Sequence, residues 1–344
     1  MTQGPGTRDT ARSIPGAFGL SPAHIAALLR TAGRAPSLHN SQPWRFLVTP
    51  HTIELHADPH RSPAVADPDG CAMRIGCGAA LFNLQLALHG HDIRPIVTIL
   101  PDRARRDLLA VVRHGGTKQQ TPEQRDLLRA VPLRRTDRHP FADSPVDTSA
   151  LHALRRAALD EGAWLHIVQN PGQRAALRAI AARAHREQNA DPAFRAEFAD
   201  WVAVAPDRRE GVPAHAGGPL PEPQDHWVLS DFTAATGTDR VPGKDFEPEP
   251  VIAVLSAHLS GPSAEVQVGQ ALQRVLLTAT ANGLATSFLS HVVEVPRTRE
   301  ELRRLIGGVT PPQAVLRIGH GWPVAEVHRR AVEDTLTSDD STAV

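Results

Sequence analysis

The stretch from residue 36 to residue 46 carries side chains that could bind a flat, polar ligand. Pro36 and Ser37 form a short turn that leads through Asn40 and Gln42 to Trp44, and an apolar, strand-like run follows. A rigid loop of this kind presents amide and hydroxyl groups. These groups suit a heteroaromatic ligand with hydrogen-bond donors and acceptors along one edge. The sequence therefore predicts a ligand-binding loop here.

His39 lies inside this loop, and the sequence allows two roles for it. Its imidazole could donate a proton to a second substrate, or it could be a hydrogen-bonding residue of the loop. The chain has 18 histidines, but it contains no His-Glu-x-x-His and no Cys-x-x-Cys spacing. We therefore expect scattered surface histidines and no metal site.

A second cluster of side chains that could bind a ligand contains three arginines and a hydroxyl within five positions: Arg134, Arg135, Thr136 and Arg138. The arginine fork matches the oxygens of a phosphate and stays charged at any working pH. The cluster is therefore a candidate phosphate clamp. A solvated, charged face is the alternative interpretation.

Together these motifs resemble the nitroreductase family, in the arrangement of its acg-type branch. Pro-Ser-Leu-His-Asn-Ser-Gln-Pro-Trp is similar to the segment by which nitroreductase-fold enzymes hold FMN. Arg-Arg-Thr-x-Arg is similar to the family's Arg-Arg-Ser-x-Arg, which holds the FMN phosphate, with Thr replacing Ser. In the family the two segments come from different subunits of an obligate dimer. The resemblance also implies that Arg138 and the amide of Asn40 stabilise the anionic reduced flavin.

The resemblance extends to the C-terminal part of the chain. Residues 283–291 are similar to the family segment whose backbone N–H groups approach flavin N5 and O4, with Ser290 and His291 replacing its glycine-containing turn. Arg329 and Arg330 resemble basic residues near the phosphate. The implied cofactor-binding residues are Pro36, Ser37, Leu38, His39, Asn40, Gln42, Arg134, Arg135, Thr136, Arg138, Ser290, His291, Arg329 and Arg330.

These segments need a framework, and apolar periodicity predicts one of mixed helices and strands. Ser21-Pro22 is typical of a helix start, and two nearly all-apolar stretches are typical of buried helices. One predicted helix begins near Ser21, and the others cover 71–88, 151–159, 172–188 and 266–282. The predicted strands cover 46–48, 53–57, 96–100, 164–168 and 251–256.

The two apolar helices show small and large residues in the same order, Gly78 to Leu86 matching Gly269 to Leu277. We interpret this as an internal duplication, although any two core helices rich in Ala and Leu look alike. With the resemblance, it predicts an α+β nitroreductase-like fold whose halves, 17–114 and 123–336, form a pseudo-dimer in one chain. Residues 1–16 and 338–344 are expected to be flexible tails.

The Pro- and Gly-rich segment 205–250 is the longest stretch without periodicity, which favours a lid, a binding loop or disorder. The resemblance implies an FMN-dependent oxidoreductase that takes hydride from NADH or NADPH. It would pass the hydride through flavin N5 to a conjugated small-molecule acceptor, or dehydrogenate a biosynthetic intermediate. The alternative is an FMN-sequestering protein closed by 205–250. A third is a partner-binding protein without flavin.

Composition excludes several other classes. The 344 residues include 37 Lys plus Arg and 37 Asp plus Glu, so no global charge favours nucleic acid or an anionic membrane. We see no apolar run approaching the roughly 18 to 20 residues of a membrane span and no signal core, so we expect a cytoplasmic protein. Cys71 and Cys77 point to different helix faces and predict buried thiols. Further self-association stays open.

Overall fold

Two four-stranded sheets and a layer of helices build the protein. The computed structural model describes residues 14–205, 207–238, 240 and 250–337. The predicted tails therefore lie almost wholly outside the described residues, as does part of the 205–250 segment. The fold is α+β, as the sequence predicts.

The first sheet has the strand order β1-β2-β4-β3, and every neighbouring pair is antiparallel. The hairpin predicted at 46–57 forms its edge. Thr49 and Thr52 close the turn, because the backbone N–H of Thr49 donates to Thr52 O at 2.9 Å. Its strands are β1 (Trp44–Val48), β2 (Thr52–Ala57), β3 (Ile93–Ile99) and β4 (Leu108–Thr117).

The second sheet repeats this order as β5-β8-β10-β9, again antiparallel throughout. Its connections are longer. Two helices, two short strands and a 3₁₀ turn stand between β5 and β8 in the described residues, where the first sheet has a tight turn, and two helices stand between β9 and β10. Its strands are β5 (Ala163–Ile167), β8 (Val251–Ala257), β9 (Ala285–Phe288) and β10 (Pro312–Gly319). The helices and strands between β5 and β8 are α5 (Pro171–Ala190), α6 (Pro192–Trp201), β6 (Val202–Val204) and β7 (Val212–Pro213).

The remaining helices follow local sequence signals. Ser21 caps the first helix, with Pro22 at its first position, and Thr121 forms a capping box with Gln124. A mostly polar helix of nine residues follows Thr121, where the sequence predicts no element. The helices are α1 (Pro22–Ala32), α2 (Cys71–His89), α3 (Pro122–Ala130), α4 (Thr148–Asp160), α7 (Pro262–Ala281), α8 (His291–Glu294) and α9 (Pro296–Leu305).

Helices α2 and α7 cross in backbone contact at the centre of the molecule. A Cβ atom on Gly78 would lie 2.0 Å from Val266 O, and one on Gly269 would lie 2.1 Å from Ile75 O. Only glycine fits at these two positions. The contact is reciprocal, because the spacing from Gly78 to Ile75 equals that from Gly269 to Val266. The buried Gln273 Nε2 also donates to Asn83 Oδ1 across the crossing at 2.8 Å.

Helix α2 also corrects one sequence expectation. Its 19 residues are long and apolar enough to cross a membrane by length and composition alone. Most of this stretch, 78%, is buried inside the protein. It packs against α1, α7 and the first sheet, so its all-round apolar character suits a core helix.

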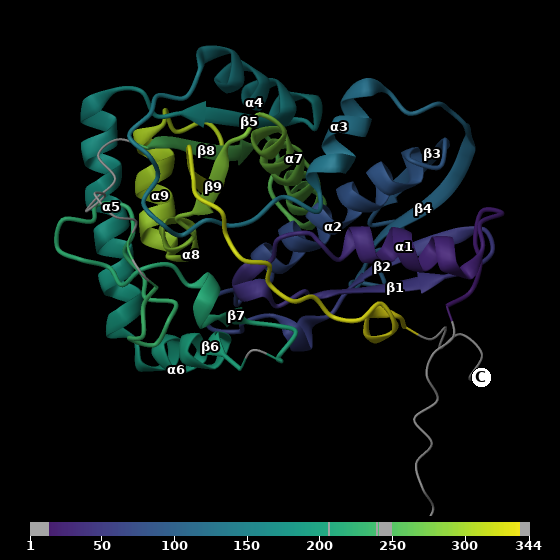
Figure 1. Ribbon diagram of the computed structural model, residues 1–344, viewed down its shortest axis with the longest axis horizontal. Helices are drawn as coiled ribbons and strands as arrows, with labels where there is room; N and C mark the ends of the chain where they lie inside the picture. The colour runs from purple at the N-terminus through teal and green to yellow at the C-terminus, as the bar shows by residue number, and fades with distance from the viewer. Residues whose placement is uncertain (1–13, 206, 239, 241–249, 338–344) are drawn as a thin grey trace, which may run out of the picture.

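The chain returns to the first sheet at its C-terminal end. Val332 and Leu336 are buried in the core beneath β1, and Leu336 forms a parallel bridge with Phe46. In Figure 1 this yellow segment runs from the second sheet across to β1. The C-terminal arginines are thereby brought beside the loop that precedes β1.

Candidate functional site

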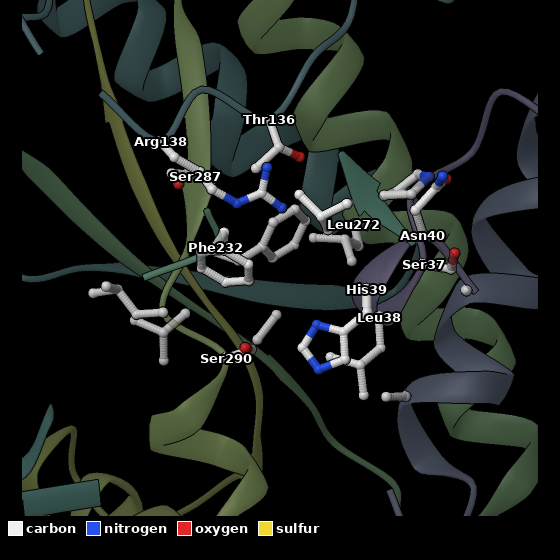
Figure 2. A pocket seen from close by; sticks show the side chains of 18 of the residues that line it. Ser37, Leu38, His39, Asn40, Thr136, Arg138, Phe232, Leu272, Ser287 and Ser290 are labelled. Carbon is white, nitrogen blue, oxygen red and sulfur yellow. The ribbon is translucent and has the colours of Figure 1, made fainter. Parts of the chain in front are cut away.

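One cavity of about 230 Å³ brings the predicted segments together. Residues 36–40 from the first half and the 134–138 stretch from the second contribute to its wall. Apolar side chains, including Leu38 and Leu272, lie between their polar groups (Figure 2). The cavity is therefore polar at its margins and apolar in the middle, which suits a flat ligand with a charged end.

The loop before β1 has an unusual backbone. A short 3₁₀ turn, Leu38–Asn40, is followed by β1, and φ is positive at His39 (48°), Asn40 (57°) and Gln42 (52°). Such values are uncommon for residues with a side chain and concentrate at functional sites. The hydroxyl of Ser37 stabilises the turn by accepting from the backbone N–H of Gln42 at 2.9 Å.

The side chain of Asn40 holds other parts of the protein. Its Nδ2 donates to Gly211 O at 3.1 Å and to His328 O at 3.3 Å. Its Oδ1 accepts from Nη1 of Arg329 at 2.8 Å. Both amide hydrogens are therefore used within the protein, so Asn40 could donate to a flavin only by giving up one of these bonds. Asn40 lines the cavity and also holds Arg329 and two chain segments.

Gln42 has the same kind of role behind the cavity wall. Its Nε2 donates to Arg209 O at 2.7 Å, and its Oε1 accepts from the backbone N–H of Arg330 at 2.9 Å. The guanidinium of Arg330 donates to Gln42 O and Trp44 O at 3.1 and 3.3 Å. Gln42 and Arg330 are thus the two predicted residues that the structure does not bring to the cavity wall.

His39 is buried in an aromatic environment. Its ring meets Phe198 edge-on, with centroids 5.3 Å apart, and lies 6.4 Å from that of Phe232. Burial, and then the charge of Arg138, lower the pKa of His39 to about 3. The imidazole is therefore neutral at physiological pH. Within the described residues its Nε2 atom has no hydrogen-bond partner.

Two arginines at the cavity wall, the buried Arg134 and the half-buried Arg329, have guanidinium nitrogens without a partner in the described part of the chain. Arg134 is 4% exposed, and its Nε and Nη1 atoms have no partner in the described part of the chain; the same holds for Nε of Arg329. Burial and the neighbouring arginines lower the pKa of Arg134 to about 9 and that of Arg329 to about 10. A desolvated guanidinium without a counter-ion is unfavourable, so this arrangement favours the binding of an anion.

Two more arginines flank the same region nearer to solvent. Arg34 forms an ion pair with Glu326 at 2.9 Å, and Arg135 lies 3.6 Å from the same carboxylate. Arg135 also donates to two backbone carbonyls. Glu326 is therefore an internal counter-ion of the cluster, although no motif in the sequence marks it.

Arg138 contacts the segment that covers the cavity. Its Nη1 donates to Ala216 O at 2.8 Å, and its guanidinium lies 4.4 Å from the centre of the Phe232 ring. Figure 2 shows Phe232 between Arg138 and His39. Burial lowers the pKa of Arg138 to about 10, and the charge of Asp137 opposes this shift. Phe232 was not predicted, because it lies in a segment without periodicity.

The remaining predicted residues enter the cavity wall from β9 and α8. Thr136 forms a parallel bridge with Thr286, which places the arginine stretch beside β9. Ser290 and His291 begin α8 and line the cavity. His291 is 7% exposed, and burial followed by the charge of His185 lowers its pKa to about 3.

Asp137, which the sequence did not single out, supports this arrangement. It is 2% exposed and accepts from the backbone N–H groups of His139 and Trp322 at 2.9 and 3.1 Å. Arg317 donates to the neighbouring carbonyl of His139 at 3.1 Å. These contacts fix the backbone between Thr136 and Arg138 against the second sheet.

The segment 205–250 has more structure than its sequence predicts. Asn40 and Gln42 hold residues 209–211, and a 3₁₀ turn follows at Ala214–Ala216. Trp227 and Phe232 line the cavity. The described part of this segment therefore forms one wall of the site.

Similar proteins of known sequence come from Mycobacterium tuberculosis. One, named "Putative NAD(P)H nitroreductase acg", is 31% identical over 295 residues, which are 86% of this chain and 88% of that protein. A second with the same nitroreductase description is 31% identical over 304 residues, covering 86% of this chain and 84% of its own length. No family model matches the chain.

Solved structures give a weaker likeness. A nitroreductase with bound FMN from Desulfitobacterium hafniense has a TM-score of 0.39 at 14% identity, covering 62% of this chain and 98% of its own. Another, from Bacteroides fragilis, has a TM-score of 0.36 at 14% identity, covering 63% and 97%. TM-scores below 0.5 are too low to support a structural conclusion.

Proposed function

Because this chain belongs to the acg-type nitroreductase family, we propose that it is an FMN-dependent NAD(P)H oxidoreductase that reduces a conjugated small-molecule acceptor. One observation carries the proposal. The loop 36–40 and the arginine stretch 134–138, far apart in sequence, line one cavity, and at its wall Nε and Nη1 of Arg134 and Nε of Arg329 have no partner among the described residues. An anionic nucleotide with a flat ring would satisfy them.

FMN, when bound, supplies hydride transfer, and the protein supplies binding and electrostatics. Arg134 and Arg329 would neutralise its phosphate, since both have buried guanidinium nitrogens without a partner in the described part of the chain. Asn40 holds Arg329 in place. The apolar wall at Leu38 and Leu272 would exclude water from the ring.

We further propose that the two halves, 17–114 and 123–336, arose by duplication. The shared strand order and the reciprocal contact of Gly78 and Gly269 support this history. In a symmetric dimer each residue of an isologous interface meets its equivalent in the same way. The composite site then corresponds to one of the two interface sites of such a dimer.

Arg134→Ala tests the cofactor site. Losing hydrogen bonds to a charged group should weaken FMN binding about tenfold to a hundredfold. The FMN-free chain should unfold no more easily, because the variant removes a buried, unpaired cation. Arg129→Ala, at an exposed arginine paired with Asp126 on α3, is the matched control. Unchanged FMN affinity in the Arg134 variant, measured by flavin fluorescence titration, would refute the site.

A second function is favoured by Phe232. This side chain enters the cavity against Arg138 and His39, where it would cover a bound ring and shut out nicotinamide. The protein would then sequester FMN without turnover. Anaerobic addition of NADH and NADPH separates the two functions. If the protein is the enzyme, its bound flavin loses its yellow colour when NADH or NADPH is added. If the protein sequesters FMN, the wild type stays yellow and only the Phe232→Ala variant loses its colour.

A further inference from the structure

A second group of polar side chains lines the cavity apart from the arginine cluster. It consists of His291 and Glu294 on α8 and Arg299 on α9. Among the described residues no hydrogen bond or ion pair connects this group to Arg134 or Arg329. The cavity therefore has a polar region that the proposed phosphate site does not use.

Glu294 has one oxygen bonded and one oxygen unused. Its Oε2 accepts from Nε2 of Gln188 at 2.7 Å, while its buried Oε1 has no partner within the described residues. The buried Nε2 of His291 is likewise without a partner there. Arg299 donates from Nε to Val293 O, and no partner for its two terminal nitrogens is found in the described part of the chain.

Asp67, a second carboxylate in the same wall, shows what a structural acid looks like. Its two oxygens accept from the backbone N–H groups of Ala72 and Met73 at 2.9 and 2.8 Å, and from the Ser62 hydroxyl at 3.2 Å. It therefore caps the start of α2, and both of its oxygens are bonded. Buried polar atoms nearly always have a hydrogen-bond partner, so the unused Oε1 of Glu294 indicates that a ligand hydrogen-bonds there.

The surroundings of Glu294 favour its neutral form. Burial raises the pKa of its carboxyl above the usual range, and the charge of Asp67 adds to this. The hydrogen bond from Gln188, the nearby Ser290 side chain and the charge of Arg299 act in the opposite direction. The neighbouring imidazole of His291 is neutral, and His185 on α5 faces that ring, with centroids 6.1 Å apart.

We infer that Glu294 is the proton donor to the electron acceptor, and that the acceptor is an oxygen-terminated conjugated molecule such as a quinone. This rests on the proposed function. The carboxylic O–H and the Arg299 nitrogens are donors, which suit carbonyl oxygens that become negative on reduction. The acceptor gains a hydride, with its electron pair, from the reduced cofactor and a proton on oxygen from Glu294. Water then returns a proton to the carboxylate.

Glu294→Gln tests the inference, because the amide keeps the size and the bond to Gln188 but cannot give up a proton. FMN-loaded protein is reduced chemically and mixed with p-benzoquinone in a stopped-flow instrument across a pH series. In the wild type the reoxidation rate should fall as pH rises through the pKa of Glu294. The variant should be slower by on the order of a hundredfold and lose this pH dependence. Glu294→Asp should keep it.

Two further variants separate a chemical role from a structural one. Glu187→Gln makes the same charge change at an exposed carboxylate on α5, and should reoxidise like the wild type. Gln188→Leu removes a hydrogen bond that favours the carboxylate, so the fall in rate should move to higher pH. Infrared titration of the full chain should show an acid carbonyl band that is absent in Glu294→Gln.

The outcomes distinguish this inference from the proposed function. Wild-type rates and pH dependence in Glu294→Gln would overturn the inference, even if NADH or NADPH bleaches the protein. Failure of both nucleotides to bleach it would count against the proposed function, while the chemically reduced protein still tests Glu294. A chain that binds no FMN would overturn both.

Discussion

The connection from α1 to β1 and the connection from α4 to β5 join corresponding elements by very different means. The first spans residues 33–43 and lines the cavity. The second is only Glu161 and Gly162, and Glu161 accepts from Arg274 at 2.9 Å in a network with Asp160 and Glu123. The first connection contains backbone with positive φ and a buried His39 Nε2 atom without a partner among the described residues, whereas the second closes the surface with paired charges.

This difference shows how one framework carries chemistry at a single place. Both connections leave a helix and enter an edge strand of a sheet with the same order. The position of the site therefore follows from the longer loop and from the segments that surround it, while β9 and β10 of the second sheet also contribute residues to the cavity wall. The second half contributes those segments through the insertions that follow β5 and β9.

Substitutions on either side of the crossing of α2 and α7 should lower the free energy of unfolding equally. This is the largest effect that we expect. Gly78→Ala and Gly269→Ala each place a methyl group about 2 Å from a backbone carbonyl oxygen, at 2.0 and 2.1 Å. The helices must separate, so we expect each variant to lower the free energy of unfolding by roughly 3 kcal/mol. Equilibrium urea unfolding measures this.

Gly33→Ala is the control for the crossing. Its added Cβ atom would lie 3.4 Å from Leu29 O, an ordinary contact, and its effect should stay within about 0.5 kcal/mol. A large loss in only one of the two crossing variants would show that the halves do not share the contact equally, and would weaken the proposed duplication.

Much of the framework was predictable, because its signals are local. Helix α2 was expected at 71–88 and is found at Cys71–His89, since it is apolar on nearly every side. Strand β4 (Leu108–Thr117) was missed as a whole, and its last residues continue through Gly115 and Gly116, which suggested a connection. Helix α3 was missed because it buries only Leu127 and Ala130.

The site was predictable in its chemistry and much less so in its contacts. Residues 36–40 and 134–138 were found by type and spacing, and they do meet in one cavity. The partners of Asn40 are backbone carbonyls of Gly211 and His328, and a carbonyl leaves no signal in a sequence. Phe232 and Glu326 were invisible for a related reason, because their segments have no period.

The buried histidines give the second prediction, which concerns acid. His39 and His291 both have folded-state pKa values of about 3, below the unfolded value of about 6.5. The unfolded chain therefore binds their protons first, and their stabilising contribution, complete above pH 6.5, is lost as pH falls toward 3. Each histidine should cost up to about 1.4 kcal/mol per pH unit in this window.

Unfolding free energies at pH 6.5 and pH 4.5 for His39→Gln and His291→Gln measure this dependence. Each variant should lose less stability than the wild type between the two pH values. His51→Gln, at an exposed histidine in the first hairpin, should follow the wild type. If all three variants lost the same unfolding free energy between the two pH values, the two histidines at the cavity would be no more buried than the exposed His51.

The smallest expected effect concerns the longer connection itself. Asn40→Ala removes the bonds to Gly211 O and His328 O and frees Arg329. We expect only about 1 kcal/mol of lost global stability, because His328 is exposed and its carbonyl can reach water. The local effect should be larger, since residues 209–211 and 328–330 lose one of the two side chains that hold them, and Gln42 remains. Limited proteolysis should then cut near these residues faster than in the wild type.

Asn40→Asp makes the test specific. The carboxylate can still accept from Arg329, but it cannot donate to the two carbonyls. If Asn40 acts by holding Arg329, Asn40→Asp should bind FMN better than Asn40→Ala while both are cut equally fast. If Asn40 instead donates directly to the cofactor, the two variants should bind FMN equally weakly. Both variants alter the 33–43 connection, which has no counterpart of its length between α4 and β5. The result therefore shows whether this connection binds the cofactor directly or holds neighbouring segments in place.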